Sequence, residues 1–248
     1  MRAVVVGASS GLGRCIGIGL GRRGAQVALL ARRRDRLESA AAEAGEGALA
    51  IACDVTDEQS CRRAVADAAA GMGGIDALVY ATGVGPLARL ADIDAATWQQ
   101  TFATNVTGAA IVTAAALPHL TESSGAAVYL SSISASLTPP WPGLGGYIVS
   151  KAALEKLVEA WRVEHPAVGF TRLSVGDCAG GEGHGATEFS AGWDMEVASE
   201  VMPIWVARNY IAGALLDVDD LVGAVDFVLR LGAGASVPSL VVTPRPVQ

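Results

Sequence analysis

The sequence predicts one doubly wound α/β domain, in which a mostly parallel sheet of about seven strands carries helices on both faces. Short apolar runs alternate with helical patterns along most of the chain, which favours parallel pairing through right-handed crossovers. The runs are apolar almost throughout, as expected for strands covered on both sides. No internal repeat or polar linker divides the chain, so residues 1–248 are expected to form a single domain.

The expected strands are short apolar runs that end at glycines or polar residues. In chain order they span residues 3–6, 26–30, 48–53, 75–80, 126–130, 170–175 and 239–243. The run at 3–6 is β-branched and leads directly into Gly7, as a buried strand before a tight turn does.

The expected helices show apolar residues at helical spacing or a start signal. In chain order they span residues 13–23, 36–44, 57 onward, 96–117, 150–161 and 219–231. In the first, Ile16 and Leu20 lie one turn apart on one face. Thr56 is expected to be the N-cap of the third. Residues 176–210 show no regular pattern and are expected to be irregular.

Composition and charge exclude several classes of function. The chain has 18 Lys and Arg against 25 Asp and Glu, a net charge of −7, so no positive field would attract nucleic acid or an anionic membrane. No stretch approaches the ~18 uninterrupted apolar residues of a membrane helix. The four cysteines form no CxxC pair and the three histidines show no ligand spacing, so no metal site is expected. Without a signal-peptide pattern at the N-terminus, a reducing cytoplasmic setting is expected.

A glycine-rich turn, Gly7-Ala8-Ser9-Ser10-Gly11-Leu12-Gly13, joins the first strand to the first helix. Glycines let the backbone approach a pyrophosphate, and the helix N-terminus supplies free N–H groups and a positive dipole. A turn without a ligand is the alternative, but the position between strand and helix favours a nucleotide. The expected contacts in this turn are Gly7, Ser9, Ser10, Gly11, Leu12 and Gly13.

The second strand ends in Leu30-Ala31-Arg32-Arg33. An NAD enzyme usually has an acidic residue here for the ribose 2′-hydroxyl, whereas arginine accommodates a 2′-phosphate. The sequence therefore predicts NADP(H), with Arg32 as the main contact and Arg33 as support; a solvated basic turn is the alternative. Asp54 and Val55 end the third strand, where the carboxylate can accept a hydrogen bond from the adenine amine.

Tyr147 and Lys151 are four residues apart and would share one face of a helix. A lysine ammonium about 4 Å from the phenol would favour the phenolate by up to ~4 kcal/mol at an effective dielectric of 20. We therefore expect Lys151 to lower the pKa of Tyr147 towards the range that serves acid–base catalysis.

Together with Asn105-Val106-Thr107-Gly108 and Ser131-Ser132 at a strand end, these motifs give a chain that resembles the short-chain dehydrogenase/reductase family over about residues 3–243. The resemblance implies a Rossmann-like fold and a hydride exchanged between a nicotinamide and a carbinol carbon. It implies that Tyr147 exchanges a proton with the substrate oxygen, that Ser132 polarises the carbonyl, and that Lys151 holds the nicotinamide ribose. Asn105 would hold a water that links Lys151 to solvent.

The chain departs from the family at two strand ends that are expected to meet the cofactor. The family's Asn-Asn-Ala-Gly is replaced by Tyr80-Ala81-Thr82-Gly83, and the family's Pro-Gly by Val175-Gly176, which Asp177 and Cys178 follow. The expected cofactor contacts at these two ends are Ala81, Thr82, Gly83, Gly176 and Cys178.

Ser132 and Ser134 are both candidates for the catalytic serine. The strand alignment selects Ser132, which lies 15 residues before Tyr147. The family's commoner, shorter separation would select Ser134. We favour Ser132 because the proline-rich loop at 138–142 can absorb two extra residues.

Residues 179–210 lie where the family places its substrate-covering segment. Trp193 from this segment and Trp141 from the loop before Tyr147 are candidate walls of an apolar pocket, although lid tryptophans could equally pack onto the core. The prediction is an NADP(H)-dependent oxidoreductase that interconverts a small apolar ketone or aldehyde and its alcohol, in a homodimer or homotetramer. The alternatives are another reaction on the same fold and a catalytically weak NADP(H)-binding regulator.

Overall fold

The computed structural model describes residues 1–211 and 213–245 and contains one seven-stranded sheet in the order β3-β2-β1-β4-β5-β6-β7. Residues 212 and 246–248 of the expected domain lie outside the described residues. Every neighbouring pair is parallel, so the predicted parallel sheet is confirmed. The strands are β1 Arg2–Val6, β2 Gln26–Ala31, β3 Leu49–Ala52, β4 Ala77–Tyr80, β5 Ala126–Ser132, β6 Gly169–Val175 and β7 Ser239–Val242.

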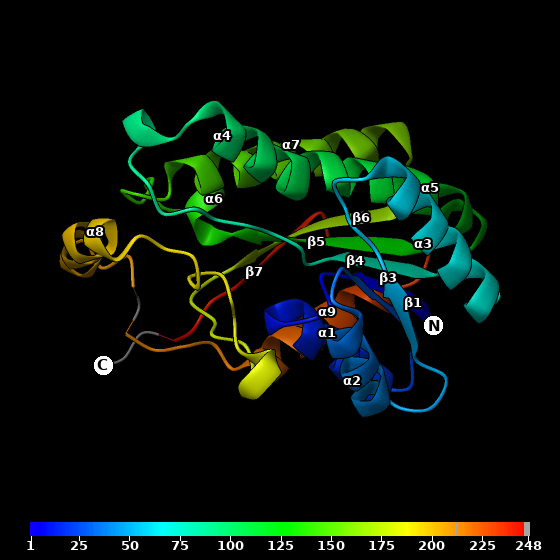
Figure 1. Ribbon diagram of the computed structural model, residues 1–248. Coiled ribbons are helices and arrows are strands. Elements are labelled where there is room, and N and C mark those ends of the chain that lie inside the picture. Colours follow the sequence, from blue (N-terminus) through cyan, green and yellow to red (C-terminus); the bar gives the residue numbers. More distant parts are fainter. Residues whose placement is uncertain (212, 246–248) are drawn as a thin grey trace.

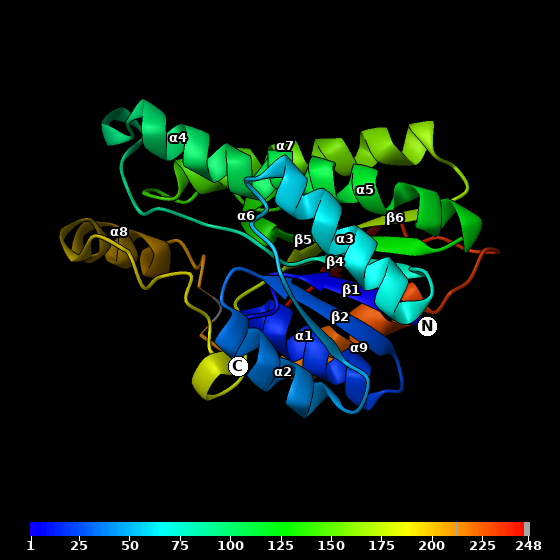
Figure 2. The same ribbon diagram turned by 45° about the vertical axis from the view of Figure 1, so that its right-hand side comes forward.

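Helices cover both faces of the sheet, as Figures 1 and 2 show. One face carries α1 Gly11–Arg22, α2 Arg34–Ala44 and α9 Val218–Leu229. The other carries α3 Glu58–Met72, α4 Ala95–Phe102, the π-helical turn η2 Ala103–Thr107, α5 Gly108–Glu122 and α7 Gly145–Glu164. The shorter elements are η1 Leu90–Asp92, α6 Ile133–Ser136, η3 Gly183–Gly185 and α8 Met195–Ala207.

The apolar strands supply two cores, one on each face. In β1, Ala3 and Val5 point into the core beneath α1, α2 and α9, whereas Val4 and Val6 point into the core beneath α3, α5 and α7. All four side chains are fully buried. Alternate side chains of a strand point to opposite faces, so covering both faces explains why the strand is apolar at every position.

The sheet order places a topological switch between β1 and β4, where the chain turns from building one half of the sheet to the other. In open α/β sheets a ligand binds in the crevice at the carboxyl ends of the strands on either side of such a switch. The glycine turn follows β1 and Tyr80-Ala81-Thr82-Gly83 spans the end of β4, so both flank this crevice.

Two local predictions are wrong. The N-cap of α3 is Asp57 and not Thr56: the Asp57 carboxylate accepts from the N–H groups of Gln59 at 2.8 Å and Ser60 at 3.1 Å. Thr56 instead donates its backbone N–H and its hydroxyl to Asp54.

The region 176–210, expected to be irregular, contains α8. Asp194 caps this helix by accepting from the N–H of Glu196 at 2.8 Å. Val197, Val201 and Trp205 recur every four residues and pack towards the interior, so a helical pattern is present in the sequence. Figure 1 shows α8 beyond one end of the sheet, clear of both helical layers.

The α4, η2 and α5 elements form one helical run, Ala95–Glu122. By length and composition alone this run could cross a membrane, but core helices pass the same test. Residues such as Val112 and Leu120 are fully buried in the core between α5 and the sheet, and the π-helical turn within the run brings Asn105 to the interior.

Candidate active site

A cleft of about 1010 Å³ opens at the carboxyl ends of the strands. Its size is at the upper end of the range for small-molecule sites. Among the residues predicted for the site, those that line the cleft are Gly7, Ser9, Ser10, Gly11, Leu12, Gly13, Arg32, Arg33, Asp54, Val55, Ala81, Thr82, Gly83, Ser132, Trp141, Tyr147, Lys151, Gly176, Cys178 and Trp193. Asn105 lies behind the cleft wall, fully buried.

The glycine turn forms a cradle that side chains would fill. Gly7 has a φ of +90°, and a Cβ there would lie 2.7 Å from Thr82 Oγ1. A Cβ at Gly13 would overlap the backbone carbonyl of Gly7. Ser10 makes no side-chain capping bond to the first turn of α1, and Gly11, Leu12 and Gly13 of that turn line the cleft. This cradle fits the pyrophosphate of a dinucleotide, because helix N-termini with bare backbone bind anions.

The two predicted arginines behave differently. Arg32 is exposed at the cleft and makes no hydrogen bond or ion pair within residues 1–211 and 213–245. Arg33 Nη2 donates to the hydroxyls of Ser9 at 2.9 Å and Ser10 at 2.8 Å, and its Nη1 pairs with Glu188 at 2.6 Å. Arg36 also pairs with Glu188. The sequence reasoning missed Arg36 and Glu188 as site residues, because no local pattern connects positions 152 residues apart.

Asp54 holds the end of β3 at the cleft. Its Oδ1 accepts from the N–H of Thr56 at 2.9 Å and from the Thr56 hydroxyl at 2.7 Å. These hydrogen bonds hold the pKa of the carboxyl below its ordinary value. Asp54 is therefore an anionic acceptor at the cleft, which is the chemistry expected of a partner for an adenine amine.

Ser132 and Tyr147 meet where β5 ends and α7 begins. Ser132 caps α6 by accepting from the Ser134 N–H at 3.2 Å, and the two serine hydroxyls are 2.9 Å apart. Burial raises the pKa of Tyr147 to about 12, while a hydrogen bond with the Ser132 hydroxyl acts in the opposite direction. Ser132 thus interacts with the phenol. Ser134 is also buried and lines the same cleft.

Lys151 lies one turn after Tyr147 on α7, and its ammonium is bonded to the end of β5. Its ammonium donates to the Leu130 carbonyl at 2.7 Å and lies 5.8 Å from the centre of the Tyr147 ring. Burial lowers the pKa of Lys151 from 10.5 to about 8. The expectation that the pKa of Tyr147 is lowered is wrong for this arrangement, because burial of the phenol raises it.

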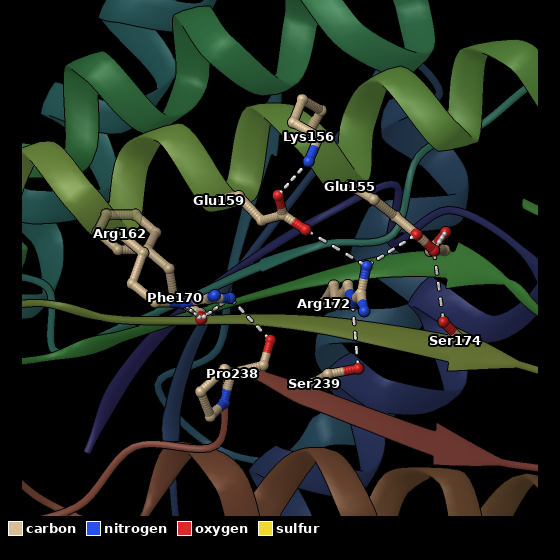
Figure 3. A network of polar contacts seen from close by, with 10 residues as sticks. Glu155, Lys156, Glu159, Arg162, Phe170, Arg172, Ser174, Pro238 and Ser239 are labelled. Carbon is tan, nitrogen blue, oxygen red and sulfur yellow. Dashed lines mark hydrogen bonds and ion pairs between the residues drawn. The ribbon is translucent and has the colours of Figure 1, made fainter. Parts of the chain in front are cut away.

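A buried carboxylate supports the lysine from one turn further along α7. Glu155 accepts from the Ser131 hydroxyl at 2.7 Å and from Arg172 on β6 at 3.1 Å, and Arg172 also pairs with Glu159 (Figure 3). The negative charge of Glu155 raises the pKa of Lys151, partly offsetting the effect of burial.

Asn105 joins the π-helical turn to the wall of the cleft. Its Nδ2 donates to the Val84 carbonyl and to Ser150 Oγ, both at 2.8 Å, and its Oδ1 accepts from the Val84 N–H at 2.8 Å. Ser150 in turn donates to the Tyr147 carbonyl at 2.7 Å. Both amide donors are therefore used to tie the β4–η1 connection to α7, and π-helical turns of this kind are frequent at functional sites.

The unusual Tyr80-Ala81-Thr82-Gly83 segment is firmly built into this wall. Tyr80 is fully buried, and its hydroxyl donates to the Thr104 carbonyl at 2.5 Å. The Ala81 N–H donates to Val6 at 2.9 Å. A Cβ at Gly83 would lie 3.3 Å from Lys151 Nζ, so the glycine that the chain shares with the family leaves room beside the ammonium.

Aromatic side chains from the covering segment form the wall opposite the Tyr147 ring. Phe189 meets that ring edge-on at 4.8 Å, and Trp193 meets Phe189 at 5.6 Å. Trp193 donates its indole N–H to Gly85 at 2.9 Å, and Trp141 packs against Trp205 at 5.4 Å. The predicted tryptophans therefore both line the cleft and anchor the segment, and the sequence reasoning missed Phe189.

The chain is similar to known oxidoreductases in sequence and in fold. A family model described as short chain dehydrogenase matches residues 1–178. Gluconate 5-dehydrogenase from Gluconobacter oxydans is 32% identical over 232 residues, which cover 92% of this chain and 86% of the relative. The chain spans only 18% to 57% of the length of the first four curated relatives that it matches.

Two solved structures share the fold and were determined with different cofactors. An alcohol dehydrogenase from Thermococcus sibiricus, complexed with 5-hydroxy-NADP, has a TM-score of 0.80 at 27% identity, covering 97% of this chain and 94% of that one. A 3-ketoacyl-(acyl-carrier-protein) reductase from Brucella melitensis, complexed with NADH, has a TM-score of 0.80 at 25% identity, covering 97% and 96%. The comparisons give no support to the alternative of a regulatory binding protein.

Proposed function

The chain belongs to the short chain dehydrogenase family of oxidoreductases, and we propose that it uses NADP(H) to interconvert a small apolar ketone or aldehyde and its alcohol. The observation that carries the proposal is that Ser132, Tyr147 and Lys151 line the same cleft as the glycine cradle and Arg32. One cleft thus holds both a site for an anionic dinucleotide and a proton donor.

The cofactor would lie along the carboxyl ends of the strands. Gly7, Gly11 and Gly13 would take the pyrophosphate, Asp54 and Val55 the adenine, and Arg32 with Arg33 the 2′-phosphate. The rest of the cofactor would lie against Ala81 to Gly83 and against the turn at Gly176 and Cys178. When bound, the nicotinamide supplies the hydride.

Tyr147 is the proposed proton donor to the carbonyl oxygen. A pKa raised to about 12 by burial keeps the phenol protonated at neutral pH, which suits carbonyl reduction. Ser132 would donate to the same oxygen and stabilise the charge that develops there. The buried ammonium of Lys151 would favour proton release from the phenol once its surroundings change.

Asn105 is proposed as a positioning residue. Its amide donors hold Val84 and Ser150, so they fix the wall beside Lys151. A water linking Lys151 to solvent would have to bind at the remaining lone pair of the amide oxygen or at the backbone of the turn.

The aromatic wall sets the proposed substrate class. Phe189, Trp193 and Trp141 present ring surfaces to the cleft next to Tyr147, which favours a substrate with an apolar body next to the reacting carbonyl. The indole N–H groups of Trp141 and Trp193 are bonded to the protein, so polar recognition of the substrate would fall to Ser132 and Tyr147.

For the assembly we propose a homodimer or homotetramer formed through α5 and α7. Val149 and Val163 on α7 are apolar and exposed, the latter by 81%, and a partner would cover them. We also keep a reducing cytoplasmic setting, which the free thiols of Cys15, Cys53, Cys61 and Cys178 suit.

Tyr147→Phe tests the proposed chemistry. NADPH consumption is measured with a panel of apolar ketones and aldehydes, and binding of NADPH and NADH is measured by titration. The variant should lose about 10²- to 10⁴-fold in kcat with NADPH affinity unchanged, because the hydroxyl alone is removed. Equal turnover by the variant would refute Tyr147 as the proton donor.

Ser132→Ala and Ser134→Ala form a matched pair for the serine. Ser132 contacts the phenol, so its loss should reduce kcat strongly, whereas Ser134→Ala should retain most of the activity. The opposite order would assign the catalytic hydroxyl to Ser134.

A further inference from the structure

The carboxylate of Glu188 lies in the cluster of cationic and hydroxyl groups beside the glycine turn. Its Oε2 accepts from Arg33 Nη1 at 2.6 Å and from the Ser10 hydroxyl at 3.1 Å. Its Oε1 pairs with Arg36. One anionic group is thus held by two guanidinium groups and a hydroxyl, the donor set that also recognises a phosphate.

This donor set is organised at the cleft and not only on the free surface. Arg33 is fixed on its other side by the hydroxyls of Ser9 and Ser10, and Arg33, Ser10 and Glu188 all line the cleft. Arg33 lies two residues after Ala31, the last residue of β2, close to the position that discriminates a ribose 2′-hydroxyl from a 2′-phosphate in this fold. The strand itself offers only Ala31 there.

Glu188 reaches this cluster from the opposite side of the cleft. It belongs to the covering segment, in which the Thr187 N–H donates to the Ala179 carbonyl at 2.8 Å. Thr187 packs next to the glycine turn, since a Cβ at Gly11 would lie 3.4 Å from the Thr187 Cα. Phe189, the next residue, packs on the Tyr147 ring. Movement of Glu188 is therefore connected to the wall of the substrate pocket.

We propose that Glu188 is a specificity-determining residue for the cofactor, whose carboxylate occupies the site of a ribose 2′-phosphate and must leave before that phosphate binds. The inference rests on the proposed function. A cofactor without the phosphate need not displace Glu188, and its 2′-hydroxyl can donate to the carboxylate. Glu188 therefore reduces the preference for NADP(H) over NAD(H) that Arg32, Arg33 and Arg36 would otherwise create.

The charge of Glu188 persists across the working pH range. The hydrogen bonds from Arg36 and Arg33 lower the pKa of the carboxyl to about 2. Protonation cannot release the residue near neutral pH, so only a competing anion can take its place. The competition is then between one carboxylate attached to the chain and one phosphate carried by the ligand.

The test compares two ligands that differ only in the phosphate, adenosine 2′,5′-bisphosphate and adenosine 5′-monophosphate, by calorimetry on the full chain. Glu188→Gln should bind the 2′-phosphorylated ligand about tenfold more tightly, the range expected for two half-exposed ion pairs. Its affinity for the 5′-monophosphate should change less than twofold. Glu188→Ala should show the same pattern, with tighter binding of the 2′-phosphorylated ligand and little change for the 5′-monophosphate.

Glu182→Gln is the matched control. Glu182 is exposed on the same segment and outside the set of residues that line the cleft, so the variant removes the same charge without altering the cluster. It should leave both affinities at the wild-type value. An equal effect of the two variants would show a general charge effect and would overturn the proposal.

The remaining outcomes separate this inference from the proposed function. Weaker or unchanged binding of the 2′-phosphorylated ligand by Glu188→Gln overturns the inference and leaves the function intact. Failure of the wild type to bind NADPH, NADH and both probes overturns the proposed function. A wild type that prefers NADH, with the preference reversed by Glu188→Gln, supports the inference and corrects the proposed cofactor.

Discussion

Replacement of Lys151 by methionine is expected to stabilise the protein near neutral pH while it abolishes turnover. Lys151 is 4% exposed, and burial of its ammonium lowers its pKa from 10.5 to about 8. A buried charge that the reaction needs is a common way for an active site to reduce stability. Methionine has a similar length and no charge, so it removes this cost and the proposed catalytic group together.

The size of the effect follows from the pKa. At 1.36 kcal/mol per pKa unit, burying the charged form costs about 3 kcal/mol at pH 7. Methionine also loses the hydrogen bond to the Leu130 carbonyl, worth about 1 kcal/mol. Lys151→Met should therefore raise the free energy of unfolding by roughly 1 to 2 kcal/mol at pH 7.

The difference in free energy of unfolding between the wild type and Lys151→Met should also depend on pH. Between pH 8 and 10.5 the folded protein has released the Lys151 proton while the unfolded chain still binds it, so the stability contributed by this residue rises with pH. The wild-type free energy of unfolding minus that of Lys151→Met should rise by roughly 2 kcal/mol between pH 7 and pH 10.

Urea denaturation at several pH values measures this difference. Subtraction removes the contribution of the buried tyrosines and cysteines, which both proteins share. Lys156→Met is the control, because Lys156 is exposed on the same helix and pairs with Glu159; it should show no such rise. A difference that stays flat from pH 7 to 10 would refute the reasoning.

Two further predictions use the same denaturation assay. Gly13→Ala should lower the free energy of unfolding by about 1 to 3 kcal/mol, because the added Cβ meets the Gly7 carbonyl. Gly223→Ala, in open space on α9, is the control and should raise the free energy of unfolding by about 0.5 to 1 kcal/mol. Equal effects of the two substitutions would contradict the clash at Gly13. Glu155→Gln should lower the free energy of unfolding by about 1 to 3 kcal/mol, because Arg172 loses an ion-pair partner. It should also move the alkaline limb of the pH–rate profile to lower pH, because Glu155 raises the pKa of Lys151. An unmoved limb would show that Glu155 does not set the pKa that governs turnover.

Local sequence patterns, namely apolar runs and the residues that follow them, were sufficient to predict the sheet and most of the residues that line the cleft. The strand at 3–6 leads into Gly7, and a parallel sheet places the carboxyl ends of its strands at one edge. The residues that follow those strands, such as Gly83 and Gly176, therefore had to lie near one another. Twenty of the predicted site residues line the cleft, and those that follow strand ends do so for this reason.

Elements without a glycine or strand-end signal were harder to predict. The prediction that residues 176–210 are irregular misses α8, although Asp194 and the spacing of Val197, Val201 and Trp205 indicate a helix. The π-helical turn at Asn105 has no signature in the sequence, since it depends on how the long helix packs against Val84 and Ser150.

By itself the sequence determined the fold, the position of the cleft and the residues that reach it, because periodicity and strand ends are local properties. Only the tertiary structure decided the state of the groups within the cleft. Spacing placed Tyr147 and Lys151 on one helix face, but burial sets the direction of both pKa shifts. Likewise, Arg33 is basic in any conformation, and only folding brings Glu188 to it from 155 residues away.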